Sequence, residues 1–160
     1  MRTGELFLSH ATPDRAFVAR LTKRLAARKI QYFYSKRHIA GARQWHDELG
    51  VALERCSWFV LILSKKSVKS QWVKRELLFA LQARRYRERI VPVLLQDCAF
   101  AKLSWTLPSF QLVDFRTKFD AGFVALLKAL RGSARVGRGT PAGRRGARGR
   151  RRRRGRGRGR

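Results

Sequence analysis

The sequence predicts an α/β domain in which a parallel β-sheet is covered by helices on both faces. Five short runs are rich in β-branched, aromatic and leucine residues, and most are continuously apolar, as strands covered on both faces are. The segments that separate them have helical spacing, and strict alternation of strand and helix indicates a parallel sheet. The expected strands are residues 6–9, 30–34, 58–64, 90–95 and 110–115.

Four segments repeat apolar residues at the spacing of one helix face. In the first of them, Phe17, Leu21 and Leu25 recur at four-residue intervals. The fourth connection, residues 96–109, contains Pro108 and residues of mixed polarity, which favours a loop or a short irregular helix. The expected helices are residues 15–28, 44–55, 71–86 and 119–130.

Composition divides the chain into a domain at residues 1–132 and a basic tail at residues 133–160. The tail holds thirteen Arg and eight Gly, with no acidic or aromatic residue. It cannot bury enough apolar surface to offset the entropy of ordering, so we expect it to be disordered. Without these thirteen charges, the net charge of +28 falls to +15 for the domain. A positive field attracts polyanions, but the charge alone does not identify which polyanion the protein binds.

Cysteine usage and hydropathy predict a soluble, cytoplasmic protein without a signal peptide. Cys56 and Cys98 have no paired spacing, so two reduced core thiols are expected. The longest apolar run, residues 58–63, is far shorter than the roughly 20 residues that cross a membrane. The three histidines are not at metal-ligand spacing, and no glycine-rich phosphate motif occurs, so neither a metal nor a resident cofactor is expected.

Three polar or basic segments follow the first three strands. Ser9 and His10 end the first, residues 34–41 follow the second, and residues 64–70 follow the third. Ligands of open parallel sheets bind beyond the carboxyl ends of the strands. This edge of the sheet is therefore the candidate site. A Ser9–His10–Asp14 catalytic triad is rejected, because adjacent strand residues point to opposite sides of the sheet.

Glu76 is the most unusual residue near this edge. In a helix that begins after Ser70, a plausible N-cap, its face also carries Trp72, Val73 and Phe79, and none of these is expected to pair with it. A carboxylate on an apolar stripe is costly to desolvate and is often functional. The alternatives are a structural ion pair, or a glutamate that reaches solvent or a basic loop.

Other residues of the edge have weaker functional interpretations. Trp72, one turn before Glu76, would present an indole beside the carboxylate, although a large aromatic residue also serves simply as core. Residues 35–43 carry three fixed cations and a glycine, including Lys36 and Arg43. Such a loop suits phosphate recognition, and it also occurs as a merely solvated basic loop.

Four motifs in the right order on the expected strands and loops resemble those of a bacterial Toll/interleukin-1 receptor (TIR) domain. The resemblance spans about residues 6–130. The matching motifs are residues 6–10 with Asp14, residues 39–41 with Trp45, residues 60–64, and residues 70–77.

The resemblance implies a flavodoxin-like fold of five parallel strands and, for many members, cleavage of the nicotinamide–ribose bond of NAD+. Glu76 matches the glutamate that those enzymes use. Trp72 would stack on a ring of the dinucleotide, Arg43 or Lys36 would meet the pyrophosphate, and the turn at Ser9 and His10 would line the nicotinamide side. NAD+ would be the substrate, and antiviral defence is the setting that the bacterial resemblance suggests.

The chain departs from the family pattern in two respects. Many relatives have an acidic residue just after the second strand, where this sequence has Ser35, Lys36 and Arg37. Many also carry a second domain that senses a trigger. Here we expect self-association with other TIR domains, or a separate sensor protein, to supply the switch.

Two other functions are compatible with the sequence. The domain could be a non-enzymatic module that recruits other TIR domains, as receptor adaptors of the family do. Alternatively, residues 133–160 could bind RNA or DNA through phosphate neutralisation, nonspecifically because the tail has no stacking aromatic residue. The tail could equally be an inert extension.

Overall fold

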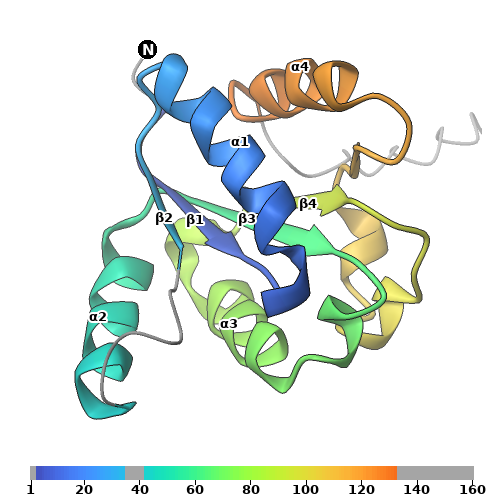
Figure 1. Ribbon diagram of the computed structural model, residues 1–160. Helices are drawn as coiled ribbons and strands as arrows, with labels where there is room; N and C mark the ends of the chain where they lie inside the picture. Colours follow the sequence, from blue (N-terminus) through green and yellow to red (C-terminus); the bar gives the residue numbers. More distant parts are fainter. Residues whose placement is uncertain (1–2, 35–41, 133–160) are drawn as a thin grey trace, which may run out of the picture.

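The computed structural model describes residues 3–34 and 42–132, with side chains described at 3–34 and 46–132. Within these ranges the chain forms a five-stranded parallel sheet in the order β2-β1-β3-β4-β5 (Figure 1). The predicted α/β fold is confirmed. The strands are β1 (Leu6–Ser9), β2 (Tyr32–Tyr34), β3 (Trp58–Leu63), β4 (Ile90–Leu94) and β5 (Val113–Asp114).

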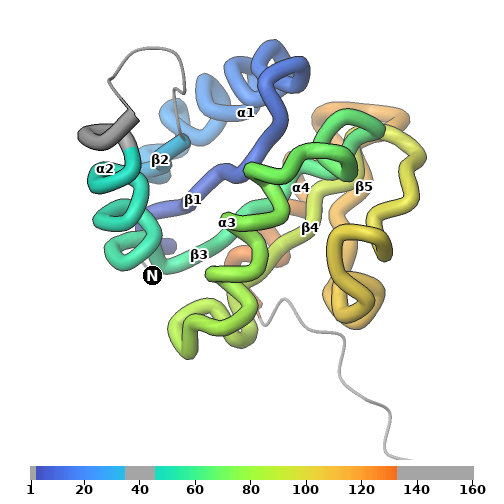
Figure 2. Tube along the Cα trace, turned by 90° about the horizontal axis from the view of Figure 1, so that it is seen from below, coloured from blue at the N-terminus to red at the C-terminus, as the bar shows by residue number. Residues whose placement is uncertain are grey.

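Helices cover both faces of this sheet. Figure 1 shows α1 and α4 on one face and α2 and α3 on the other, and Figure 2 views the molecule from the side of α2 and α3. Short 3-10 turns complete the connections, including η1 (Thr12–Asp14), η2 (Ser67–Lys69) and η3 (Arg84–Tyr86). The helices are α1 (Arg15–Ala27), α2 (Ala42–Arg55), α3 (Gln71–Gln82) and α4 (Phe119–Ala129).

Strand parity divides the core into two layers. Phe7 packs with the buried residues of α2 and α3, whereas Leu6 and Leu8 pack with those of α1 and α4. Successive side chains of a strand point to opposite faces, so each central strand supplies both layers. This is why the central strands are continuously apolar, and it also fixes where the polar residues that follow them point.

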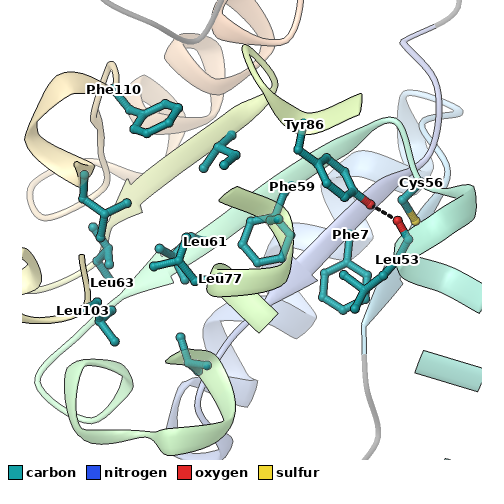
Figure 3. Close-up of a cluster of buried hydrophobic side chains, with 14 of the residues drawn as sticks. Phe7, Leu53, Cys56, Phe59, Leu61, Leu63, Leu77, Tyr86, Leu103 and Phe110 are labelled. Atoms are coloured by element: carbon teal, nitrogen blue, oxygen red, sulfur yellow. Dashed lines mark hydrogen bonds between the residues drawn. The ribbon is translucent and has the colours of Figure 1, made fainter. Parts of the chain in front are cut away.

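The layer under α2 and α3 is rich in aromatic rings (Figure 3). Phe7 and Phe59 are stacked with ring centroids 5.5 Å apart. Tyr86 is fully buried beside them, and its hydroxyl donates a hydrogen bond of 2.5 Å to the carbonyl oxygen of Leu53. The polar tip of this buried ring is therefore satisfied, as burial of a tyrosine requires.

The helix predicted at residues 71–86 ends earlier. Helix α3 stops at Gln82, Ala83 is extended (φ −76°, ψ 122°), and η3 follows. A continuous helix would carry Tyr86 away from the stripe of Leu77 and Ala80, because residues nine or six positions apart do not share a helix face. The break returns the ring of Tyr86 to the core.

The last strand is also shorter than the predicted residues 110–115. Only Val113 and Asp114 pair with β4. The carbonyl oxygen of Leu94 accepts a hydrogen bond from the N–H of Phe115, whereas the N–H of Leu95 donates to the carbonyl of Leu63 in β3. The backbone groups of successive residues therefore face β5 and β3 in turn. Pro92 lies on the side of β4 that faces β5 and has no N–H to donate, which ends the ladder there.

The remaining general predictions concern thiols and membranes. Both cysteines are unbridged, but only Cys56 lies fully in the core, because Cys98 is partly exposed in the connection before η4 (Phe100–Lys102). Among the described residues, no helix has the length and apolarity that crossing a membrane requires.

Candidate functional site

The candidate site lies where the connections from the sheet diverge. Strand β1 leads through α1 to β2 on one side, and β3 leads through α3 to β4 on the other. The carboxyl ends of β1 and β3 therefore flank the topological switch point, which is where ligands of open α/β sheets bind. Ser9 ends β1, and Ser64 directly follows β3.

Helix α3 carries Glu76 and positions it at this edge of the sheet. The side chain of Ser70 caps the helix by accepting a hydrogen bond of 3.3 Å from the backbone N–H of Val73, which confirms the predicted N-cap. Val73, Glu76 and Leu77 then share the buried face of the helix. Glu76 is only 3% exposed, so the carboxylate lies within the apolar stripe, as the spacing predicted.

Both carboxylate oxygens of Glu76 accept hydrogen bonds. The hydroxyl of Ser9 donates to Oε2, and Nε1 of Trp72 donates to Oε1. The interpretation that no neighbour on the face can pair with Glu76 is wrong, because an indole one turn earlier in a helix can turn its N–H toward the carboxylate. Hydrogen bonds donated to a carboxylate stabilise its charged form.

Strand parity explains the partnership with Ser9. Phe7 points toward α2 and α3, so Ser9, two residues later, points to the same face of the sheet and contacts Glu76 there. Ser9 is completely buried. Its role in this geometry is to hold the carboxylate.

A second buried polar pair occupies the opposite face of the sheet. Ser64 donates a hydrogen bond of 2.5 Å to Oδ2 of Asp14 in η1. Burial raises the pKa of Asp14 above its ordinary value, and the bond from Ser64 and the charge of His10 oppose the rise in part. The sequence prediction includes neither Ser64 nor Asp14 as a site residue, although a serine directly after a continuously apolar strand is the signal that could have indicated this pair.

His10 lies on the Asp14 side of the sheet. Its ring is largely buried at 7% exposure and meets the ring of Tyr34 edge-on, with centroids 5.8 Å apart. Ser9 is bonded to Glu76, and Asp14 to Ser64, so the serine and the aspartate of the rejected triad belong to two separate pairs.

The structure does not describe the side chains of the two predicted phosphate ligands. Arg43 belongs to the first turn of α2, its side chain is outside the described residues, and Lys36 is outside them altogether. The connection after β3, part of the polar segment predicted at this edge, supplies three further cations. Lys65, Lys66 and Lys69 are exposed beside the carboxyl end of β3.

The arrangement can place a buried, doubly hydrogen-bonded carboxylate next to exposed cations at one sheet edge. In that combination, the carboxylate can stabilise a developing positive charge, while the cations can meet a phosphate. No cluster of three or more His, Cys, Asp and Glu suited to a metal ion occurs in the part of the chain that the structure describes.

A doubly wound α/β domain with a buried carboxylate at its switch point is the class of protein that this geometry defines. Residues 6–127 match the family described as TIR domain. The chain belongs to the TIR domain family.

Solved structures resemble the fold. The TIR domain of the Toll-related receptor TRR-2 from Hydra magnipapillata has 18% sequence identity and a TM-score of 0.65, covering 79% of this chain and 98% of that one. The TIR domains of the activated Roq1 resistosome, which directly recognises the pathogen effector XopQ, have 25% identity and a TM-score of 0.50, covering 82% and 86%. A prokaryotic SEFIR domain has 10% identity and a TM-score of 0.63, covering 87% and 99%.

No curated protein matches the chain. The likenesses to the TRR-2 and SEFIR domains concern the fold, and the family match establishes a TIR domain.

Proposed function

We propose that the domain hydrolyses NAD+ at the nicotinamide–ribose bond, with Glu76 as the catalytic carboxylate. The observation that carries the proposal is the position of Glu76: a buried carboxylate, at the carboxyl end of a doubly wound sheet, with a neutral donor on each oxygen. A family match over residues 6–127 supports it, since the resemblance implies this chemistry at the same glutamate.

The reaction needs stabilisation of charge more than proton transfer. Nicotinamide leaves as a neutral base when the electron pair of the C1′–N1 bond passes to the cationic ring. The ribose becomes oxocarbenium-like, and a carboxylate beside it lowers the energy of that state, as acidic groups do in glycosidases. Water then adds to C1′ and loses a proton, which gives ADP-ribose, nicotinamide and one proton from NAD+ and water.

The neighbouring residues divide into two groups. Ser9 is fully buried and holds Glu76, so it acts as a positioning residue. Trp72 is partly exposed and both holds Glu76 and offers a ring to the dinucleotide. We retain the turn at Ser9 and His10 for the nicotinamide side, although the His10 ring itself lies on the Asp14 face of the sheet, and we retain Arg43 or Lys36 for the pyrophosphate.

The burial of Glu76 implies that access to it is controlled. At 3% exposure the carboxylate meets substrate only after a neighbouring group other than its two hydrogen-bond donors moves. Self-association with other TIR domains, or a separate sensor protein, would drive that movement. The Roq1 TIR domains, which belong to an activated resistosome, are a precedent for TIR domains within an assembly. Signalling or defence is the setting we propose.

The decisive experiment measures NAD+ consumption by the concentrated full-length chain, with chromatographic detection of nicotinamide. Glu76→Gln is compared with the natural chain and with Glu54→Gln, which removes the charge of an exposed glutamate in α2. Gln retains the shape of Glu, and the hydroxyl of Ser9 can accept a hydrogen bond from its amide. Circular dichroism verifies that all three proteins are folded.

Release of nicotinamide by the natural chain and by Glu54→Gln, together with its loss in Glu76→Gln, is the expected result. Equal, negligible release by all three proteins, at high concentration and with a crowding agent, would overturn the proposal.

The second candidate is a non-enzymatic interaction module. It is favoured by Leu78 and Phe79 on the outer side of α3, which are 44% and 41% exposed. Exposed neighbouring apolar residues are common at sites of protein contact. In this case Leu78→Ser with Phe79→Ser abolishes association with other TIR domains, whereas Glu76→Gln has no effect on any measured output.

A further inference from the structure

The pole of the molecule opposite Glu76 contains a second candidate binding site. A hollow of about 820 Å³ opens at the amino ends of the strands, where Trp58 begins β3. Glu76 lies by the carboxyl end of β1. Because the strands are parallel, the two places are at opposite ends of the sheet.

Three arginines from distant parts of the sequence line this hollow. Arg28 follows α1, Arg89 precedes β4 and Arg131 follows α4, and all three are exposed. None of them takes part in an ion pair that the structure records among its described residues. Glu88 is the acidic residue of the lining.

The hollow stays positive after the opposing charges are counted. Three guanidinium groups and one carboxylate leave two positive charges. The carboxyl ends of α1 and α4 add about half a negative charge each, so about one positive charge remains.

The topology places further cations around the same pole, because the helices end where the strands begin. Lys29 follows α1, and Arg84, Arg85 and Arg87 follow α3, all of them exposed. In the sequence, residues 133–160, which hold thirteen arginines, begin directly after Gly132, which lines the hollow.

We propose that this arginine hollow binds the phosphate backbone of nucleic acid. Arginine presents a planar fork that fits phosphate, and the cations of the lining are all arginines. Repeated phosphates suit a pole that bears many cations and continues into an arginine-rich segment. The folded domain thus contributes a docking site of its own, distinct from the tail and facing away from Glu76.

The contact between Trp58 and Arg89 in the lining of the hollow indicates which part of a nucleic acid is bound. Trp58 is only 6% exposed, and the guanidinium of Arg89 lies 5.8 Å from the centroid of its ring. A covered indole cannot stack on a base, whereas it can orient the arginine above it. Binding is therefore to the backbone and has little sequence preference.

The test compares two triple variants of the full-length chain. Arg28→Gln with Arg89→Gln and Arg131→Gln removes the cations of the hollow, and Lys65→Gln with Lys66→Gln and Lys69→Gln removes the same charge at the opposite pole. Binding to a fluorescent 20-base-pair DNA and to its RNA counterpart is followed by anisotropy from low to moderate salt. Thermal unfolding verifies that both variants are folded.

The hollow variant is expected to bind at least tenfold more weakly than the natural chain, with a slope of log affinity against log salt that is shallower by about two to three. The lysine variant is expected to lose much less. Equal losses in both variants would overturn the proposal, since net charge or the tail would then explain the binding, and so would the absence of any loss. Polyglutamate that competes as well as DNA at equal charge would also overturn it.

Discussion

Ser9 donates a hydrogen bond to Glu76 across 67 positions of sequence, from the last residue of β1 to the second turn of α3. The contact joins an interior strand of the sheet to the helix that carries the candidate catalytic residue. The corresponding contact on the other face of the sheet is the hydrogen bond from Ser64 to Asp14, two residues 50 positions apart. A serine at the carboxyl end of β1 and another directly after β3 thus each bond to one buried carboxylate.

Ser9→Ala is expected to weaken both the fold and the proposed activity. The variant leaves Oε2 of Glu76 buried without its hydroxyl donor, which costs about 1–3 kcal/mol of unfolding free energy. Nicotinamide release should fall as the carboxylate loses its position. Urea unfolding and the NAD+ assay measure the two effects.

Ser64→Ala is the matched control for Ser9→Ala, because it removes a hydroxyl donor from the other buried carboxylate. It should lose stability to a similar extent and retain most of the nicotinamide release. A parallel loss of activity in both variants would show that the effect of Ser9 is only structural.

Trp72→Phe is expected to separate the two roles of the indole. Phenylalanine keeps an aromatic ring but has no N–H for Oε1 of Glu76. The loss of one hydrogen bond to a charged group corresponds to about a tenfold or larger fall in kcat, with little change in KM. Trp72→Ala should in addition raise KM, because it removes the ring that the dinucleotide would stack on. Identical kinetics for Trp72→Phe and the natural chain would contradict this role for the indole N–H.

Asp14 should destabilise the fold increasingly as the pH rises. Its pKa is raised in the folded protein mainly by burial, so the protonated form is favoured by folding. Its contribution is then most favourable below the ordinary value of 3.8 and is lost as the pH rises through the folded value. The unfolding free energy of the natural chain, relative to that of Asp14→Asn, should therefore fall as the pH rises from below 3.8 through the raised pKa of the folded state.

Denaturant unfolding at several pH values checks this sign. His10 is the titratable group whose charge acts on Asp14, so the same comparison is repeated with His10→Gln. A relative stability that increases with pH in both backgrounds would contradict the assignment.

Gly122→Ala and Gly50→Ala are expected to act in opposite directions. A Cβ at Gly122 in α4 would lie 2.6 Å from the ring of Phe115 and 2.8 Å from the carbonyl oxygen of Asp114, so overpacking should cost about 1–3 kcal/mol. A Cβ at Gly50 in α2 meets nothing within 4 Å, and the higher helix propensity of alanine should add about 1 kcal/mol. Thermal unfolding distinguishes these shifts, and the same sign in both variants would refute the packing argument.

The sequence by itself determined the fold class and the inward position of Glu76. Continuously apolar strands have few places to lie except inside a covered sheet, and the spacing of Val73, Leu77 and Ala80 fixes which face of α3 is buried. Ser70 likewise caps that helix through a hydrogen bond between residues only three positions apart. Patterns of this kind are local, so they are visible along the chain.

Only the tertiary structure decided which polar groups meet. Ser9 and Glu76 become partners because β1 lies in the interior of the sheet and α3 crosses its end. Arg28, Arg89 and Arg131 share one hollow because the helices end at the pole where the strands begin. The end of α3 before Tyr86 and the short ladder of β5 beside Pro92 also depend on packing. Contacts between residues far apart in sequence depend on the order of the strands and the crossing of the helices, which periodicity in a single segment does not encode.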